Sequence, residues 1–209
     1  MDLSGKATGQ FQDRNDYMMY PSPVASRHPL PSGEGSLLVE RLRANESAAN
    51  DELFRIYGDG VTRLAHWMLS DPSDRSRVVH ETFQKVSCSI QSFSHDSSLR
   101  IWIFRIALSK IQLRTCWWKR QTRIRADSEL MPKEIVVRVG LQELSHGNRL
   151  ILVLRDIEGL SYAEISEVLG VSMRSVKSRL IRARGQMMTS IIRQQKSDSA
   201  LLVNQTTFL

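Results

Sequence analysis

Residues Asp156–Arg184 read DIEGLSYAEISEVLGVSMRSVKSRLIRAR, and this stretch predicts two helices joined by a tight turn. Ser161 and Glu164 have the spacing of a capping box, in which each side chain accepts a hydrogen bond from the other residue's backbone N–H. Gly170 can adopt the left-handed backbone that ends a helix, and Ser172 can cap the next one. We therefore expect a first helix, a turn and a second helix.

The second helix of this pair is amphipathic and strongly basic. Its apolar residues recur at helical spacing, while the cations fall mostly on the other faces. The apolar stripe is Val176, Leu180, Ala183 and Met187. No Asp or Glu occurs from Val168 through Gln195. Because charges of one sign repel one another along a helix, this composition favours a polyanion as partner.

The layout is typical of a helix-turn-helix, whose second helix enters a DNA major groove. The alternative is an ordinary helix pair with a solvated basic face.

The composition of the chain also favours a polyanion as partner. The chain has 209 residues and a formal net charge of +7, which favours nucleic acid or an anionic membrane surface as partner. No apolar run approaches the roughly 18 to 20 residues that a membrane span needs, and the N-terminus lacks the pattern of a signal peptide. Cys88 and Cys116 lie far apart and have no metal-ligand spacing. We expect them to be reduced thiols in a cytoplasmic protein.

The pattern of apolar residues predicts an all-α fold made of two small helical domains joined by a flexible linker. Nothing alternates at the period of two that strands require, and Asp71-Pro72-Ser73-Asp74 reads as a helix break and restart. Ser145 can cap a helix in the second domain. The expected divisions are a disordered arm at 1–36, a helical domain at 37–123, a linker at 124–134, a helix-turn-helix domain at 135–194 and a tail at 195–209.

A second basic segment lies in the first domain, where one long helix is expected from Leu99 to about Arg123. No acidic residue occurs from Ser97 to Ala126, and Trp102, Phe104, Trp117 and Trp118 alternate with the cations. Such a mixture suits single-stranded nucleic acid, because bases stack on aromatic rings. The alternative is that these aromatic residues belong to the core.

The order of these motifs resembles the bacterial RNA polymerase sigma factors of the extracytoplasmic-function (ECF) group. The resemblance runs from Leu37 to Met188 and rests on LLVERLRANESAANDELFRIYGDGVTRLAHWML, VVHETFQKV, SSLRIWIFRIA and the helix-turn-helix. It implies a transcription initiation factor that is not an enzyme. The first domain would resemble sigma domain 2, and the second would resemble sigma domain 4.

The resemblance implies several partners. The first domain would dock on the clamp helices of core RNA polymerase and open DNA at the minus-ten element, and the second would sit on the polymerase flap and read the minus-thirty-five element. An anti-sigma factor is a further expected partner. The polymerase contacts are expected to include Asp74, Arg77, Val78, His80, Glu81 and Gln84.

For DNA, the resemblance assigns the minus-ten element to a loop and the start of the basic aromatic helix. These residues are Phe93, Ser94, His95, Asp96, Ser97, Ser98, Arg100, Trp102 and Arg105. In the recognition helix, the early residues Arg174, Ser175, Lys177 and Ser178 are expected to reach base edges. The later residues Arg179, Arg182 and Arg184 are expected mainly to hold phosphates.

The sequence also departs from the family pattern. Acidic residues usually precede the VVQETF-like motif, but here that place reads Asp74-Arg75-Ser76-Arg77, and His80 replaces the glutamine. Leu108, Ser109 and Leu113 replace polar or charged residues that are common in the long helix. The usual acidic partners of the polymerase clamp are therefore partly replaced by cations.

Two other functions remain as alternatives. A stand-alone helix-turn-helix regulator would use its first domain to sense a signal or to dimerise. A nucleic-acid-processing enzyme would need clustered carboxylates or a metal site, and the sequence contains no such cluster. His80-Glu81 begins an HExxH pattern, but residue 84 is Gln, so the zinc motif is incomplete. We expect no metal, cofactor or small-molecule substrate.

Overall fold

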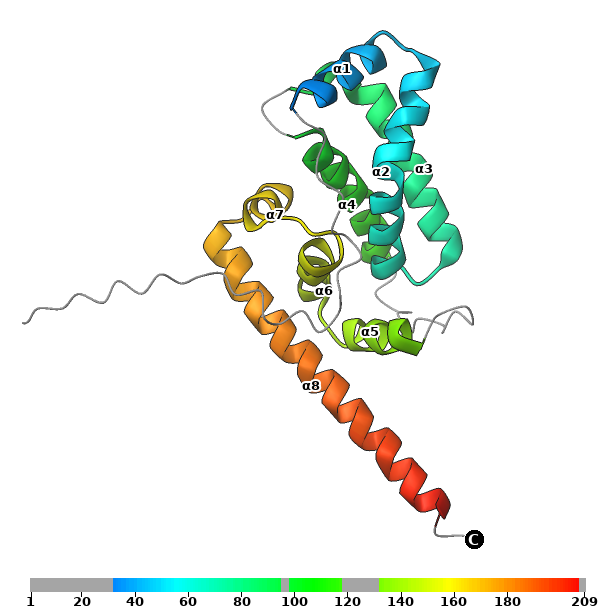
Figure 1. Ribbon diagram of the computed structural model, residues 1–209, viewed down its shortest axis with the longest axis vertical. Helices are drawn as coiled ribbons and strands as arrows, with labels where there is room; N and C mark the ends of the chain where they lie inside the picture. Colours follow the sequence, from blue (N-terminus) through cyan, green and yellow to red (C-terminus); the bar gives the residue numbers. More distant parts are fainter. Residues whose placement is uncertain (1–31, 95–97, 118–131, 207–209) are drawn as a thin grey trace, which may run out of the picture.

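The computed structural model describes residues 32–94, 98–117 and 132–206, and all regular structure in these ranges is helical. This confirms the all-α prediction. The first helical unit, residues 32–117, contains α1 (Ser32–Arg43), α2 (Ser47–Met68), α3 (Pro72–Ser89), the 3-10 turn η1 (Ile90–Ser92) and α4 (Leu99–Trp117). Figure 1 shows α2, α3 and α4 packed alongside one another, with α1 at one end of the group.

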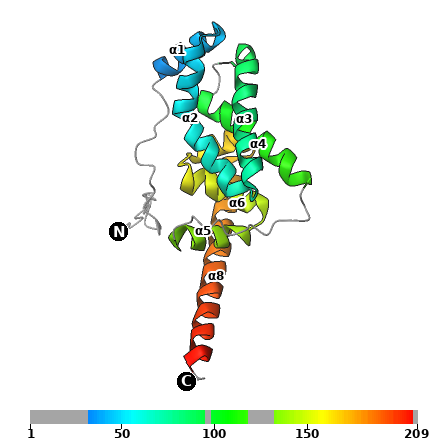
Figure 2. The same ribbon diagram turned by 90° about the vertical axis from the view of Figure 1, so that its right-hand side faces the viewer.

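The second helical unit, residues 132–206, contains the helix-turn-helix. Its elements are α5 (Pro132–Gln142), α6 (His146–Leu152), the π-helical turn η2 (Val153–Ile157), α7 (Tyr162–Leu169) and α8 (Met173–Thr206). Helix α8 packs against α5, α6 and α7 through its first half and then runs away from the other helices, as Figures 1 and 2 show. The recognition helix is thus the beginning of a much longer helix.

The predicted helix boundaries follow from local capping. Asp71 caps α3 by accepting hydrogen bonds from the backbone N–H groups of Ser73 and Asp74, and Pro72 occupies the first helical position. These bonds favour the ionised carboxylate and lower the pKa of Asp71, with the Ser73 hydroxyl making the largest contribution. Ser145 caps α6 by accepting from the N–H of Asn148. Both predicted starts are confirmed.

The turn between α7 and α8 has the predicted geometry. Ser161 and Glu164 form both bonds of the capping box, at 3.1 and 2.7 Å. Gly170 ends α7 with φ 63° and ψ 33°, in the left-handed region. Ser172 then accepts a hydrogen bond from the N–H of Ser175 at 3.3 Å. Three short-range signals in the sequence thus determine the angle at which α8 leaves the turn.

Three helices extend across the expected domain divisions. Helix α1 begins at Ser32, inside the expected arm, and α5 begins at Pro132, inside the expected linker. Proline is well tolerated in the first helical turn, so Pro132 starts a helix here. Helix α8 continues through the expected tail to Thr206, because no Gly or Pro interrupts it after Gly185. The rest of the arm, most of the linker and Trp118–Arg123 lie outside the described residues.

The turn can be tested with two glycines that differ in backbone conformation alone. A methyl group at Gly170 or at Gly185 would meet no other atom within 4 Å. We expect Gly170→Ala to lower the free energy of unfolding by about 1 kcal/mol, because φ is positive there. We expect Gly185→Ala, inside α8, to raise that free energy by about 0.5 to 1 kcal/mol. Urea denaturation followed by circular dichroism measures both, and effects of the same sign would contradict the left-handed turn.

Candidate nucleic-acid and protein interfaces

The recognition helix presents its cations to solvent. Val176, Leu180 and Ala183 are buried, so the predicted apolar stripe faces the core of the second helical unit. Most of the residues predicted to read or hold DNA are exposed on the opposite side. The exposed residues are Arg174, Lys177, Ser178, Arg179, Arg182 and Arg184, and Ser175 is half-buried. The structure thus brings the predicted set together on one accessible surface.

Two residues of this set have partners within the second helical unit. Arg184 donates to Asp156 at 2.6 Å, and this hydrogen bond raises the pKa of Arg184. The Lys177 ammonium lies 5.8 Å from the centre of the Tyr162 ring. By contrast, no ion pair joins Arg174, Arg179 or Arg182 to a carboxylate within the part of the chain that the structure describes.

The predicted minus-ten residues lie in a different environment. Arg100 is mostly buried, and its Nη2 donates to the backbone oxygen of Glu158 at 2.7 Å, while its Nη1 lies 3.7 Å from Glu164. Arg105 is more exposed, and it donates twice to the backbone oxygen of Glu167, at 3.1 and 2.7 Å. Both arginines lie on α4, and their acceptors lie on or beside α7. The second helical unit therefore occupies the guanidinium groups that sequence analysis predicts for DNA.

The remaining minus-ten residues divide into buried and exposed ones. Phe93 is buried, and its ring lies 5.0 Å from that of half-buried Trp102. Ser94 and Ser98 are exposed at the two ends of the loop. The predictions for His95, Asp96 and Ser97 fall outside the described residues. Trp102 thus belongs partly to the core, which was the alternative considered for it.

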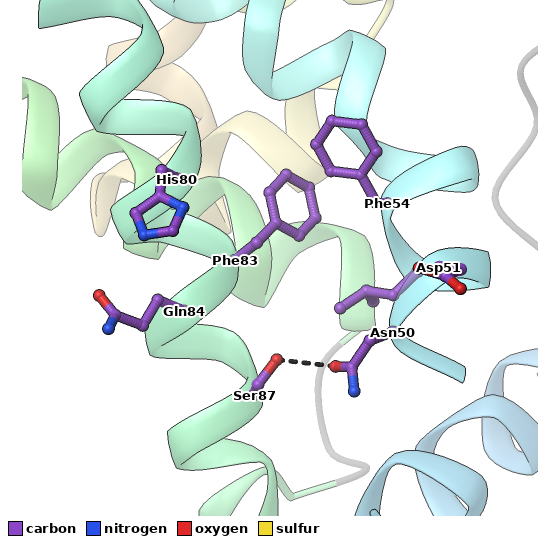
Figure 3. Close-up of a pocket in the computed structure, with 8 residues that line it drawn as sticks. Asn50, Asp51, Phe54, His80, Phe83, Gln84 and Ser87 are labelled. Atoms are coloured by element: carbon purple, nitrogen blue, oxygen red, sulfur yellow. Dashed lines mark hydrogen bonds between the residues drawn. The ribbon is translucent and has the colours of Figure 1, made fainter. Parts of the chain in front are cut away.

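A groove between α2 and α3 collects two of the residues predicted to contact polymerase. His80 and Gln84 are exposed on α3 and line the groove together with Phe54 and Phe83 (Figure 3). The two phenylalanine rings meet edge to face with centroids 5.1 Å apart, and Phe54 remains 51% exposed. At one end of the groove, Ser87 bonds the Asn50 side chain. An exposed aromatic ring in a groove with a polar rim is typical of a protein-binding site.

Three of the four other predicted polymerase residues are less accessible. Asp74 and Glu81 both pair with Arg114 of α4, at 3.2 and 2.6 Å. Val78 is completely buried, so it supports the core and offers no contact surface. Arg77 is exposed. The acids that remain on α3 are therefore already neutralised within the first helical unit.

Sequence reasoning missed two features. Arg63 of α2 makes a two-bond ion pair with Glu158, with both distances 2.8 Å, and Glu158 is only 1% exposed. These residues are 95 positions apart, so no local pattern signals the pair. The exposed ring of Phe54 is the second feature, and its only signal in the sequence is an aromatic residue shortly after the polar Asn50-Asp51.

Two further observations concern metal binding and membrane spanning. In the described ranges, no group of three or more His, Cys, Asp or Glu side chains is arranged to hold a metal ion. Among the same residues, no helix has the length and apolar character needed to cross a membrane.

Comparison with known proteins agrees with the geometry of the second helical unit. Residues 136–187 match the family described as "Sigma-70, region 4". The ECF RNA polymerase sigma factor SigE of Mycolicibacterium smegmatis is 31% identical over 156 residues, covering 66% of this chain and 59% of that protein. The ECF RNA polymerase sigma-E factor of Haemophilus influenzae is 28% identical over 170 residues, covering 70% of this chain and 89% of that protein.

Solved structures extend the likeness to the fold of both units. CnrH in complex with the cytosolic domain of CnrY superposes with a TM-score of 0.62 at 27% identity, covering 74% of this chain and 95% of CnrH. A second solved structure is the sigma factor RpoE of Bartonella quintana in complex with the anti-sigma factor NepR. It superposes with a TM-score of 0.54 at 20% identity, covering 77% of this chain and 95% of RpoE. At this identity the likeness supports the fold alone.

The fold and the exposed recognition helix define a helix-turn-helix protein of the sigma-70 type. Residues 136–187 carry the sigma-70 region 4 fold, and over most of its length the chain is similar to ECF RNA polymerase sigma factors.

Proposed function

We propose that the chain is a transcription initiation factor that binds core RNA polymerase and directs it to promoters. The observation that carries the proposal is the capped helix-turn-helix within residues 136–187, from which α8 projects an exposed basic surface. The proposal gives the chain no catalytic reaction, cofactor or small-molecule substrate.

The second helical unit would read the minus-thirty-five element as duplex DNA while resting on the polymerase flap. The first turns of α8 would enter the major groove, where Arg174 and Lys177 can donate to base edges. Arg179 and Arg182 lie further along the helix and would hold the phosphate backbone. Arg184 is already bonded to Asp156, so its contribution to phosphate binding would be smaller.

The first helical unit would hold the minus-ten element after DNA opening. Extruding a base costs a few kcal/mol, which stacking and a pocket must offset. The loop that begins at Ser94 and ends at Ser98 would supply the pocket. Arg100 and Arg105 would hold the backbone, and the half-buried ring of Trp102 would line the site.

Two protein partners are part of the proposal. The groove with Phe54, His80 and Gln84 would receive the clamp helices of polymerase, since it offers apolar and polar groups side by side. An anti-sigma factor is the second proposed partner, supported by the similarity to CnrH, which was solved with the cytosolic domain of CnrY. Both partners imply action in the cytoplasm.

The alternative is a stand-alone helix-turn-helix regulator that binds DNA without being a subunit of RNA polymerase. Purified core polymerase distinguishes the two functions, because a sigma factor binds it stably and starts transcription at defined sites. We expect the purified protein to pull down core polymerase. We also expect transcription by the resulting complex to start at defined sites. Absence of binding at moderate salt, with any anti-sigma factor removed, would favour the regulator.

Base reading by α8 is tested with Arg174→Ala and Lys177→Ala. Each substitution should cost about 1 to 3 kcal/mol at particular base pairs of the promoter and little elsewhere. Competition binding with a set of single-base promoter variants measures this pattern. Equal weakening on every sequence would remove these residues from the base-reading set.

Phosphate binding by α8 is tested with Arg182→Ala. Affinity should fall by a similar factor on all sequences, and the slope of log affinity against log salt should decrease by about one unit. Arg184→Ala is the matched comparison, since its guanidinium already pairs with Asp156. The slope should change less for that variant, and an unchanged slope for Arg182→Ala would contradict its role.

Polymerase docking is tested with Phe54→Ala. Truncating an exposed aromatic anchor should weaken binding to core polymerase by about 1 to 2 kcal/mol, and binding to isolated minus-thirty-five duplex should not change. Leu37→Ala is the control, because Leu37 is 57% exposed on α1 and does not line the groove. Equal effects of the two substitutions on polymerase binding would exclude the groove.

A further inference from the structure

We propose that Gly58 is a positioning residue for the groove between α2 and α3, because it holds the Phe54 ring in the place from which the ring can contact a partner. The missing side chain of Gly58 leaves room for this ring to lie flat against α2. The inference rests on the proposed function, since it takes Phe54 to be a polymerase-binding residue.

The contact between Phe54 and Gly58 is face-on. A methyl group at Gly58 would lie 3.3 Å from each of three carbons of the Phe54 ring, namely Cδ2, Cε1 and Cε2. A point at equal distance from three carbons of a six-membered ring lies on the axis through the centre of the ring. This distance is also shorter than the optimal separation of about 3.5 to 4.0 Å between carbon atoms. The ring therefore covers the position that the first side-chain carbon of any other residue would take.

Helix geometry explains why position 58 meets this ring. The Cα–Cβ bonds of a helix tilt toward its N-terminus, so a side chain at position 58 would point at residue 54, one turn earlier. A helical Phe side chain adopts two of the three staggered χ1 values, because the third collides with the preceding turn. A methyl group at Gly58 would thus displace the ring, and few other positions are open to it.

The backbone at Gly58 does not itself require glycine. Among the glycines that the structure describes, positive φ occurs at Gly159 and Gly170, whereas Gly58 lies inside α2. Alanine would stabilise such a helix position relative to glycine. Gly58 is nevertheless buried, while Phe54, whose ring covers it, is 51% exposed. The feature that distinguishes glycine here is therefore the space it leaves for the ring.

The same ring is held from a second side by α3. Phe83 meets it edge to face, with centroids 5.1 Å apart, and Figure 3 shows both rings between α2 and α3, near His80 and Gln84. Gly58 and Phe83 thus fix the ring, yet half of Phe54 stays open to a partner. A side chain that is fixed before binding loses little conformational freedom on binding, which strengthens the association.

The position of the ring is tested by NMR spectroscopy of the full chain. A proton above the face of an aromatic ring is shifted upfield by the ring current, and one Hα of Gly58 occupies that place. We expect it to resonate upfield of the Hα protons of Gly35, whose missing side chain meets no atom within 4 Å. Phe54→Ala should remove the shift. An ordinary Hα shift for Gly58 in the wild-type chain would overturn the inference, whatever the chain binds.

The effect on binding is tested with a double-mutant cycle of Gly58→Ala and Phe54→Ala, using the full chain and core polymerase. Gly58→Ala should weaken binding about threefold to tenfold, the order of coupling expected between residues in contact. In the Phe54→Ala background, the same substitution should change binding by less than about twofold, because the ring that it displaces is gone. A role of Gly58 in helix packing alone predicts equal losses in both backgrounds.

Gly35→Ala is the matched control, because Gly35 also lies in a helix of the first unit and has open space around it. It should leave polymerase binding unchanged. An unchanged circular dichroism spectrum shows that each variant is folded. Equal losses in the two backgrounds, or wild-type affinity of Gly58→Ala, would overturn the inference and leave the proposed function intact. Failure of the wild-type chain to bind core polymerase would instead refute the proposed function, and the binding role of the ring with it.

Discussion

A buried carboxylate governs how the two halves of this chain meet. Glu158 follows the π-helical turn of the second unit, yet the cation that neutralises it, Arg63, belongs to the first. Because an unpaired buried charge is strongly unfavourable, this pair ties the position of α7 to that of α2. The placement of α7 then brings its carbonyls and carboxylates against Arg100 and Arg105 of α4. One electrostatic requirement thus determines the environment of the proposed minus-ten site.

The helix-turn-helix is determined by interactions between residues that are close in the sequence. The capping box, the left-handed Gly170 and the Ser172 cap act within a few residues, and together they orient α8. These elements were predicted correctly from the sequence because each depends on one side chain and a nearby backbone group. The apolar stripe of α8 was predicted for the same reason, since helical periodicity is local.

The features that were missed depend on contacts between distant segments or on the absence of a signal. The Arg63–Glu158 pair joins residues 95 positions apart, and neither residue belongs to a motif. The exposed ring of Phe54 looks like any other apolar position of α2, and only packing against Phe83 reveals a groove. Helix α8 continues to Thr206 through a polar segment whose sequence has no helical periodicity, although the segment contains no residue that breaks a helix.

The two basic surfaces of the chain are unequal, because the arginines of one are exposed and those of the other are already hydrogen-bonded. On α8, Arg174 and Arg179 are exposed and no described carboxylate pairs with them, whereas on α4 the guanidinium groups are already bonded. Duplex DNA can thus approach α8 without breaking any contact between the units. A single strand that bound Arg100 and Arg105 would have to replace their hydrogen bonds to the second unit. Under the proposed function, the minus-thirty-five element can therefore be contacted before these hydrogen bonds are exchanged.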